Sequence, residues 1–160
     1  MDDRHASSPR VRAVAAADVA AVRQVLVETW HDTYDRLIGA ARVTEITDDW
    51  HAIDALAGGI CRIDHAFLLV ELGDRVIATG SAMRGEGVVE VQRLYVHPSG
   101  QGQGVGVLLL DALLARLGAM PRVEVSVMLG NTRAQAFYER EGFVAHGRDD
   151  EHVLMHRSAT

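Results

Sequence analysis

The stretch from residue 88 to residue 117 restricts the possible folds of this chain more than any other. It opens with the apolar, β-branched run VVEVQRLYV, crosses the glycine-rich segment GQGQGVG, and continues as the Ala/Leu-rich pattern of a helix. Glycines at such a junction let a ligand approach backbone N–H groups, and the first turn of a helix leaves its own N–H donors unpaired at the positive end of its dipole. The sequence therefore predicts a phosphate or pyrophosphate site at this junction.

Two well-known glycine-rich phosphate sites do not fit the spacing. A P-loop requires a lysine after its second glycine, and the chain contains no lysine. A dinucleotide fingerprint requires glycines at i, i+2 and i+5, and here the third position falls on Val105 or Val107. A glycine-rich turn that binds no ligand remains as an alternative.

The segment resembles instead the GNAT superfamily of acyl-CoA-dependent N-acyltransferases, whose motif [RQ]-x-x-G-x-[GA] follows a strand ending in an LYV-x-P-like segment. Gln101, Gly104 and Gly106 match this motif, and LYVHP at residues 94–98 precedes it.

A second signature of the same superfamily, N-x-x-A-x-x-x-Y-x-x-x-G-F, lies one helix and one strand downstream. Taken singly, its residues have ordinary structural explanations, such as a helix N-cap for the asparagine and core packing for the tyrosine. The spacing of two motifs in the right order favours the superfamily. The matching residues are Asn131, Ala134, Tyr138, Gly142 and Phe143.

Periodicity and the resemblance together predict an α/β (α+β) fold of the GNAT type. Its sheet should be mixed, mostly antiparallel and strongly twisted, with parallel strands 4 and 5 splayed apart and helices on both faces. Asp18 is expected to cap the first helix. The predicted strands are 11–14, 66–72, 75–83, 88–96, 122–129, 143–148 and 152–157; the predicted helices are 19–29 (continued or restarted at 31–37), 44 or 47 to 56, one ending at 117, and 131–140.

The strand at 88–96 does not alternate cleanly between apolar and polar residues. Mixed polarity on both faces predicts a β-bulge, or a strand that runs past a cleft.

Length and composition favour one globular domain, residues 10–160, after a flexible tail at residues 1–9. Cys61 is the only cysteine, and the N-terminus has no apolar signal region, so a cytoplasmic location is expected. The net charge of −6 argues against nucleic acid as a partner, and no apolar run reaches the roughly 20 residues of a membrane span.

The scattered histidines predict no metal site. The assembly state is open, with a homodimer as one option.

The resemblance implies a role for each motif. The backbone of Leu94 and Val96 should pair with the pantetheine amides of the cofactor, the amides from Gly102 to Val107 should hold its pyrophosphate, and Asn131 should orient its arm. Tyr138 should protonate the leaving thiolate, because a phenol remains a proton donor at neutral pH. The implied cofactor-binding residues are Leu94, Tyr95, Val96, Gln101, Gly102, Gln103, Gly104, Val105, Gly106, Val107, Asn131 and Tyr138.

Glu90 is the candidate base, because several members of the superfamily carry a catalytic glutamate at this position. Flanking valines would desolvate its carboxylate and raise its pKa, while a water-relayed base is the alternative. Some relatives that acetylate protein N-termini have a glutamate five residues before the asparagine, where this chain has Ser126.

The acceptor is expected to bind near the segment TWHDTY, which resembles the TW-x-x-TY segment of small-molecule and polyamine acetyltransferases. Trp30 and Tyr34 are i, i+4 neighbours on a helix and could form a pocket wall, although packing against the sheet is the favoured role of Trp30. The candidate acceptor residues are Glu28, Trp30, His31 and Tyr34.

These features predict an N-acetyltransferase that moves an acetyl group from acetyl-CoA, without a metal, to a primary amine of a small molecule or peptide. The amine should attack directly in a ternary complex. A catalytically weak acyl-CoA-binding sensor is the alternative, and a dinucleotide-binding module stabilised by NAD is a third hypothesis.

Overall fold

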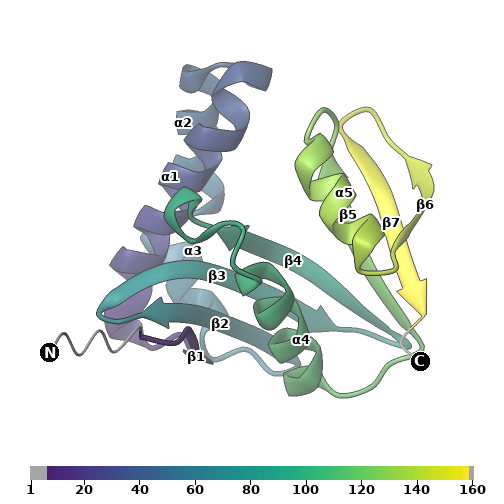
Figure 1. Ribbon diagram of the computed structural model, residues 1–160, viewed down its shortest axis with the longest axis horizontal. Helices are drawn as coiled ribbons and strands as arrows, with labels where there is room; N and C mark the ends of the chain where they lie inside the picture. Colours follow the sequence, from purple (N-terminus) through teal and green to yellow (C-terminus); the bar gives the residue numbers. More distant parts are fainter. Residues whose placement is uncertain (1–6, 159–160) are drawn as a thin grey trace, which may run out of the picture.

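The computed structural model describes residues 7–158, and within them one seven-stranded sheet forms the centre of the protein (Figure 1). The strand order is β1-β2-β3-β4-β5-β7-β6, and every neighbouring pair is antiparallel except β4 and β5. The strands are β1 (Arg10–Ala13), β2 (His65–Leu72), β3 (Arg75–Arg84), β4 (Val88–Val96), β5 (Arg122–Met128), β6 (Val144–Arg148) and β7 (His152–Ser158). This mixed, mostly antiparallel sheet confirms the predicted fold class.

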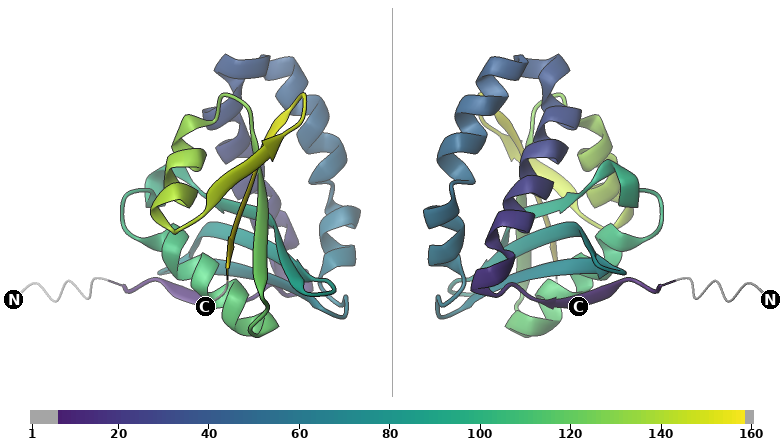
Figure 2. Two further views of the ribbon diagram at one scale, coloured as in Figure 1. Left: turned by 90° about the vertical axis from the view of Figure 1, so that its right-hand side faces the viewer. Right: turned by 90° about the vertical axis from the view of Figure 1, so that its left-hand side faces the viewer.

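Helices cover both faces of the sheet (Figure 2). One face carries α4 (Val105–Leu117) and α5 (Thr132–Arg140), and the other carries α1 (Val19–Ile38), α2 (Ala40–Trp50) and α3 (Ile53–Gly59). Two short 3₁₀ turns precede α1 and α4, at Ala16–Asp18 and Pro98–Gly100. In residues 7–158 no helix is both long and apolar enough to cross a bilayer.

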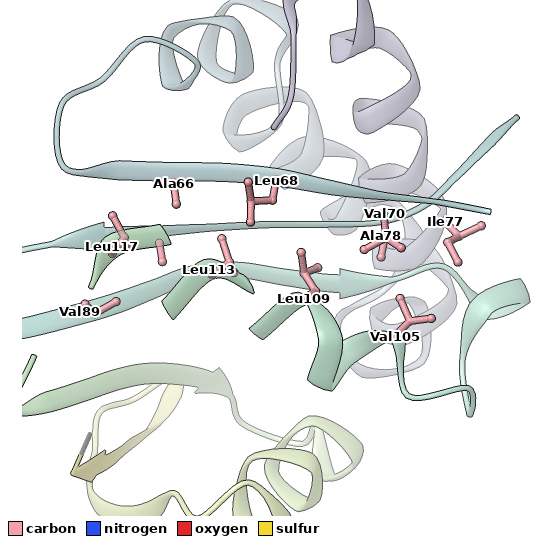
Figure 3. Packing of buried hydrophobic residues seen from close by; sticks show 11 residues of the cluster. Ala66, Leu68, Val70, Ile77, Ala78, Val89, Val105, Leu109, Leu113 and Leu117 are labelled. Atoms are coloured by element: carbon pink, nitrogen blue, oxygen red, sulfur yellow. The ribbon is translucent and has the colours of Figure 1, made fainter. Parts of the chain in front are cut away.

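The α4 helix packs on β2 and β3 through an apolar stripe. Val105, Leu109, Leu113 and Leu117 recur every four residues, face the sheet and are buried (Figure 3). Opposite them, Gly80 of β3 leaves no room for a side chain, because a Cβ there would lie 2.9 Å from Leu113 Cδ1. Close contact at this glycine brings α4 against the sheet and sets the position of the loop that precedes it.

The region between the first two strands differs in detail from the prediction. The first helix runs unbroken to Ile38, and the single helix predicted to end at residue 56 is two helices, α2 and α3. The break between α1 and α2 is at Gly39, whose φ of +88° is a conformation that other residues rarely adopt. The second helix therefore begins directly after Gly39, and the threonines proposed as caps lie inside it.

The β4 strand contains the predicted irregularity. Against β3, Ser81 is opposite Arg93 but Ala82 is opposite Val91, so Gln92 is the extra residue of a β-bulge. The bulge explains the mixed polarity, because Val89 and Val91 before it and Leu94 after it all pack on the helix α4 side.

The parallel pairing of β4 with β5 stops at the same place. Only four residue pairs, from Val88–Arg122 to Val91–Val125, join the two strands. Beyond them the backbones of the two strands diverge and form the two sides of a wedge (Figure 1).

The segment before α1 differs from the expectation at Asp18. Asp18 does not cap α1; its carboxylate accepts from the Ala15 N–H and pairs with Arg12 at 2.7 and 2.8 Å. Of the predicted flexible tail, residues 1–6 lie outside the described part of the chain, and residues 7–9 form no regular secondary structure.

Candidate functional site

The glycine-rich loop ends in a helix N-terminus that has no side-chain cap. Gly102 and Gly104 have φ values of +78° and +75°, and no atom lies within 4 Å of where their Cβ atoms would be. The Leu108 N–H is bonded to the Gly104 carbonyl at 3.1 Å and belongs to the first turn of the α4 ladder. The N–H groups of Val105, Gly106 and Val107 precede that bond and have no partner within the helix. These three donors suit an anion such as a diphosphate.

The loop is held against β4 and α5. Gln101 Nε2 donates to the Val96 carbonyl at 2.9 Å, which fastens the loop to the end of β4. A Cβ on Gly106 would lie 3.1 Å from Phe137 Cε2, so this glycine allows α4 and α5 to approach closely. The matching glutamine and glycine of the first motif thus have structural reasons for their positions.

The inner edge of β4 faces the wedge. The His97 N–H bonds to the Ile77 carbonyl of β3 at 2.8 Å, and backbone groups alternate in direction along a strand. The N–H and C=O groups of Leu94 and Val96 therefore point away from β3, towards the wedge, where β5 no longer pairs with β4. An extended chain with amide groups could add there as a strand.

Tyr138 lies on α5 next to the opening. Its ring is 5% exposed and belongs to an apolar cluster that includes Val91 and Leu94 of β4 and Val125 of β5. Burial, followed by the nearby phenols of Tyr95 and Tyr34, raises the pKa of Tyr138 well above its usual value. The hydroxyl therefore remains protonated throughout the physiological range.

Asn131 links α5 to α1 across the open end of the wedge. Its Oδ1 accepts from the Ala134 N–H at 3.1 Å, which is the predicted N-cap, and its Nδ2 donates to the Tyr34 hydroxyl at 2.9 Å. This bond connects residues 97 positions apart in the sequence.

A cavity of about 680 Å³ opens on the other face of the sheet. Its walls come from α1, α2, α3, β4, β5 and β7, so it lies beside the wedge, opposite α4 and α5. Trp30, Tyr34, Trp50 and Tyr95 form an aromatic wall, with the rings of Trp30 and Tyr34 4.5 Å apart. Glu90 and Ser126 also line the cavity.

The predicted acceptor residues are divided between this cavity and the outer surface. Trp30 and Tyr34 line the cavity, but both are almost completely buried, in line with the packing role favoured for Trp30. Glu28 is bonded instead to His97 Nε2 at 2.7 Å, and His31 to Asp35 at 2.7 Å. Neither of these two residues lines the cavity.

Glu90 lines the cavity but is exposed, contrary to the burial expected from its valine neighbours. Side chains alternate along β4, so the side chains of Val89 and Val91 point to the α4 face of the sheet and that of Glu90 points to the opposite face. These valines therefore do not surround the Glu90 carboxylate, and the desolvation expected from them is absent.

Sequence reasoning missed several cavity residues because they come from distant segments. His51 follows α2 and is buried beneath Arg93 of β4, 42 residues away, with Arg93 Nε donating to His51 Nδ1 at 3.4 Å. Burial, followed by the charge of Arg93, lowers the pKa of His51 to about 3, so this imidazole is neutral. Asp54, Arg62, His65 and His152 are further ionisable residues of the cavity that were not predicted. Periodicity does not relate such positions, and no other sequence signal points to them.

Solved structures of N-acetyltransferases share this fold. PaiA N-acetyltransferase from Thermoplasma acidophilum, solved in complex with coenzyme A, has a TM-score of 0.88 at 20% identity, covering 94% of this chain and 99% of that one. The ribosomal-protein-S18-alanine N-acetyltransferase from Escherichia coli has a TM-score of 0.74 at 15% identity, covering 96% and 95%. A GNAT-family acetyltransferase from Staphylococcus aureus Mu50 has a TM-score of 0.79 at 13% identity, covering 96% and 100%. This chain thus shares its fold with these acetyltransferases.

The acetyltransferase (GNAT) family model matches residues 30–143, most of the chain. The protein therefore belongs to the GNAT acetyltransferase family and is an acyltransferase. The uncapped amides before α4 and the edge of β4 that β5 does not pair with are features that fit an acyl-CoA.

Proposed function

We propose that the protein transfers an acetyl group from acetyl-CoA to a primary amine of a small molecule or peptide, by direct attack in a ternary complex. The observation that carries this proposal is the position of Tyr138 at the wedge, with the cavity next to the wedge on the opposite face of the sheet. A thioester in the wedge and an amine in the cavity would then meet between β4 and β5.

Binding of the co-substrate is assigned to backbone groups. The amides of Gly102 to Val107 hold the diphosphate, and the edge of β4 at Leu94 and Val96, which faces away from β3, pairs with the pantetheine amides. Asn131 acts indirectly, because its side-chain groups are already bonded to Ala134 and Tyr34. It holds the two sides of the opening at a set separation.

The chemistry requires one proton to leave the amine and one to reach the sulfur. The amine nitrogen bonds to the thioester carbon, the carbon–sulfur bond breaks, and the Tyr138 hydroxyl donates a proton to the sulfur. Burial makes the phenol a weaker acid, and the same exclusion of water would make the thiolate a stronger base. Glu90 takes the proton from the amine, directly or through a water.

The test is a thiol-release assay with acetyl-CoA over a panel of primary amines, with Tyr138→Phe as the variant. Loss of the general acid should lower kcat about 100-fold or more while KM for acetyl-CoA changes little. The variant's melting temperature with and without CoA is the control for folding and binding. Turnover equal to that of the parent would remove Tyr138 from this role, and the same assay on Glu90→Gln tests the base.

CoA binding without turnover would indicate a different function. Stabilisation by CoA with no thiol release for any amine would favour the sensor hypothesis over the transferase.

A further inference from the structure

Arg93 is a partly buried cation that lines the cavity without an acidic partner. Its Nη2 donates to the Trp50 carbonyl at 2.9 Å and its Nε to His51 Nδ1 at 3.4 Å. In the described residues, 7–158, no carboxylate oxygen lies within 4.0 Å of the guanidinium, and Nη1 makes no hydrogen bond. Burial lowers the pKa of Arg93, which means that the surroundings do not compensate its charge. A partly desolvated guanidinium of this kind attracts an anion.

His51 does not supply the missing negative charge. Arginine can only donate, so His51 Nδ1 is the acceptor in their contact, and the neutral imidazole carries its proton on Nε2. The other ionisable groups that face the cavity are Asp54, Arg62, His65, Glu90 and His152. His65 is bonded to the Gly59 carbonyl and His152 lies 3.3 Å from Asp149. Within residues 7–158, Asp54, Arg62 and Glu90 form no ion pair with one another or with Arg93.

The bulge at Gln92 places Glu90 and Arg93 on the same wall. In a regular strand, residues three apart point to opposite faces, and the one extra residue reverses that relation. Both side chains line the cavity, yet they form no ion pair with each other. The cavity therefore presents a carboxylate and a guanidinium at separate positions along one strand.

We propose that the acceptor is an amine that also carries a carboxylate, with the carboxylate bound at Arg93 and the amine towards Glu90 and the wedge. This inference rests on the proposed function and names the substrate class for it. The free Nη1 edge offers the planar donor geometry that carboxylates prefer. A polyamine is excluded from this mode, because its second ammonium would lie against the guanidinium and be repelled.

The first experiment uses the unmodified protein. ω-Amino acids with one to five methylenes between the amine and carboxylate are each compared with the matching carboxamide, and with putrescine and spermidine as polyamine probes. For at least one chain length, kcat/KM for the acid should exceed that for the carboxamide by about tenfold or more, since hydrogen bonds to charged groups are the strong ones. Equal values for every pair, or a preference for the polyamines, would overturn the inference.

The second experiment uses Arg93→Met, with Arg42→Met as the matched control. Arg42 lies on α2 in an exposed pair with Glu45 and does not line the cavity. The acid-to-carboxamide ratio of kcat/KM should fall about tenfold or more in Arg93→Met, recover in part in Arg93→Lys, and stay unchanged in Arg42→Met. An unchanged ratio in a folded Arg93→Met protein would overturn the inference.

Calorimetry in the presence of CoA separates this inference from the proposed function. Binding of at least one ω-amino acid of the series more tightly than its carboxamide, with that binding weakened about tenfold or more by Arg93→Met, would support the inference even if no thiol is released. In that case the proposed acetyl transfer is wrong, and the proposed carboxylate site at Arg93 is supported. Thiol release with polyamines alone would support the acetyl transfer and contradict the carboxylate site.

Discussion

At the scale of single residues, Asn131 joins local structure to the site. It caps α5 through the Ala134 N–H and also bonds to the hydroxyl of Tyr34 on α1. Replacement by alanine removes both bonds, whereas Tyr34→Phe removes only the second.

Asn131→Ala should lower the free energy of unfolding by about 1–2 kcal/mol, the usual cost of losing an N-cap. Tyr34→Phe should cost less, because the cap remains. Thermal or denaturant unfolding of the two variants measures the difference. If Tyr34→Phe costs as much as Asn131→Ala, the cap contributes nothing and this explanation is wrong.

Asp18 has a different role from the one its sequence position suggests. Hydrogen bonds from Arg12, which also bonds to Glu71 of β2, lower the pKa of Asp18 to about 2. In an unfolded chain the pKa of this carboxyl is near 4. The ionised carboxylate therefore stabilises the fold above about pH 4, and this contribution is lost as the pH falls from about 4 towards 2.

In Asp18→Asn, the free energy of unfolding should therefore fall less steeply than in the parent as the pH is lowered from about 4 towards 2. Denaturant unfolding measured at several pH values provides the comparison. Asp48→Asn, which removes an exposed pair with Arg23, is the matched control and should leave this pH dependence unchanged. A fall as steep in Asp18→Asn as in the parent would contradict the assigned pair.

These residues show what a sequence reveals at this scale. The cap at Asn131 was predictable because it depends on neighbours three residues away. The pair of Arg12 with Glu71 and the pair of Glu28 with His97 were not, because strand pairing and helix packing bring Glu71 and His97 to their partners from far along the chain. Local propensity indicates that a side chain can bond, but not which distant group will reach it.

At the scale of elements, the bulge in β4 has the largest effect on the site. Without Gln92, the strand would alternate regularly, with Val89, Val91, Leu94 and Val96 on one face. The pattern of polarity was therefore enough to predict a bulge, although not that β4 and β5 separate beside it.

Deletion of Gln92 should allow β4 and β5 to continue pairing and so close the wedge. We expect a protein that melts at or above the parent's temperature but no longer binds CoA, measured by calorimetry. Gln92→Ala keeps the extra residue and should bind CoA as the parent does. A deletion variant that folds and binds CoA with unchanged affinity would show that the bulge does not hold the wedge open.

The helices before β2 mark the limit of the prediction at this scale. Apolar periodicity located α1, but the sharp turn at Gly39 and the short α3 were not recognised, so α2 was started too late. In the structure Trp50 ends α2, His51 lies in the turn that follows it, and both line the cavity.

At the scale of the whole molecule, the sheet consists of two parts joined by four residue pairs between β4 and β5. One part contains β1 to β4, and the other contains β5, β7 and β6. A ligand that bridges both parts should stabilise the native state by mass action.

CoA at 100 times its dissociation constant should stabilise the fold by about 2.7 kcal/mol. For a chain of this size the melting temperature should rise by about 5–10 °C. Thermal melts with CoA and with NAD at equal concentrations make the comparison, and NAD should have no effect. A larger rise with NAD would restore the dinucleotide-binding hypothesis.

The placement of the helices has a consequence for how two molecules could use one opening. The amides before α4 and the cavity among α1, α2 and α3 lie on opposite faces of the sheet. If acyl donor and acceptor bind at these places, each arrives and departs by its own route. A spent donor then need not clear the path of the acetylated product, and the order in which the two leave is set by affinity rather than by obstruction.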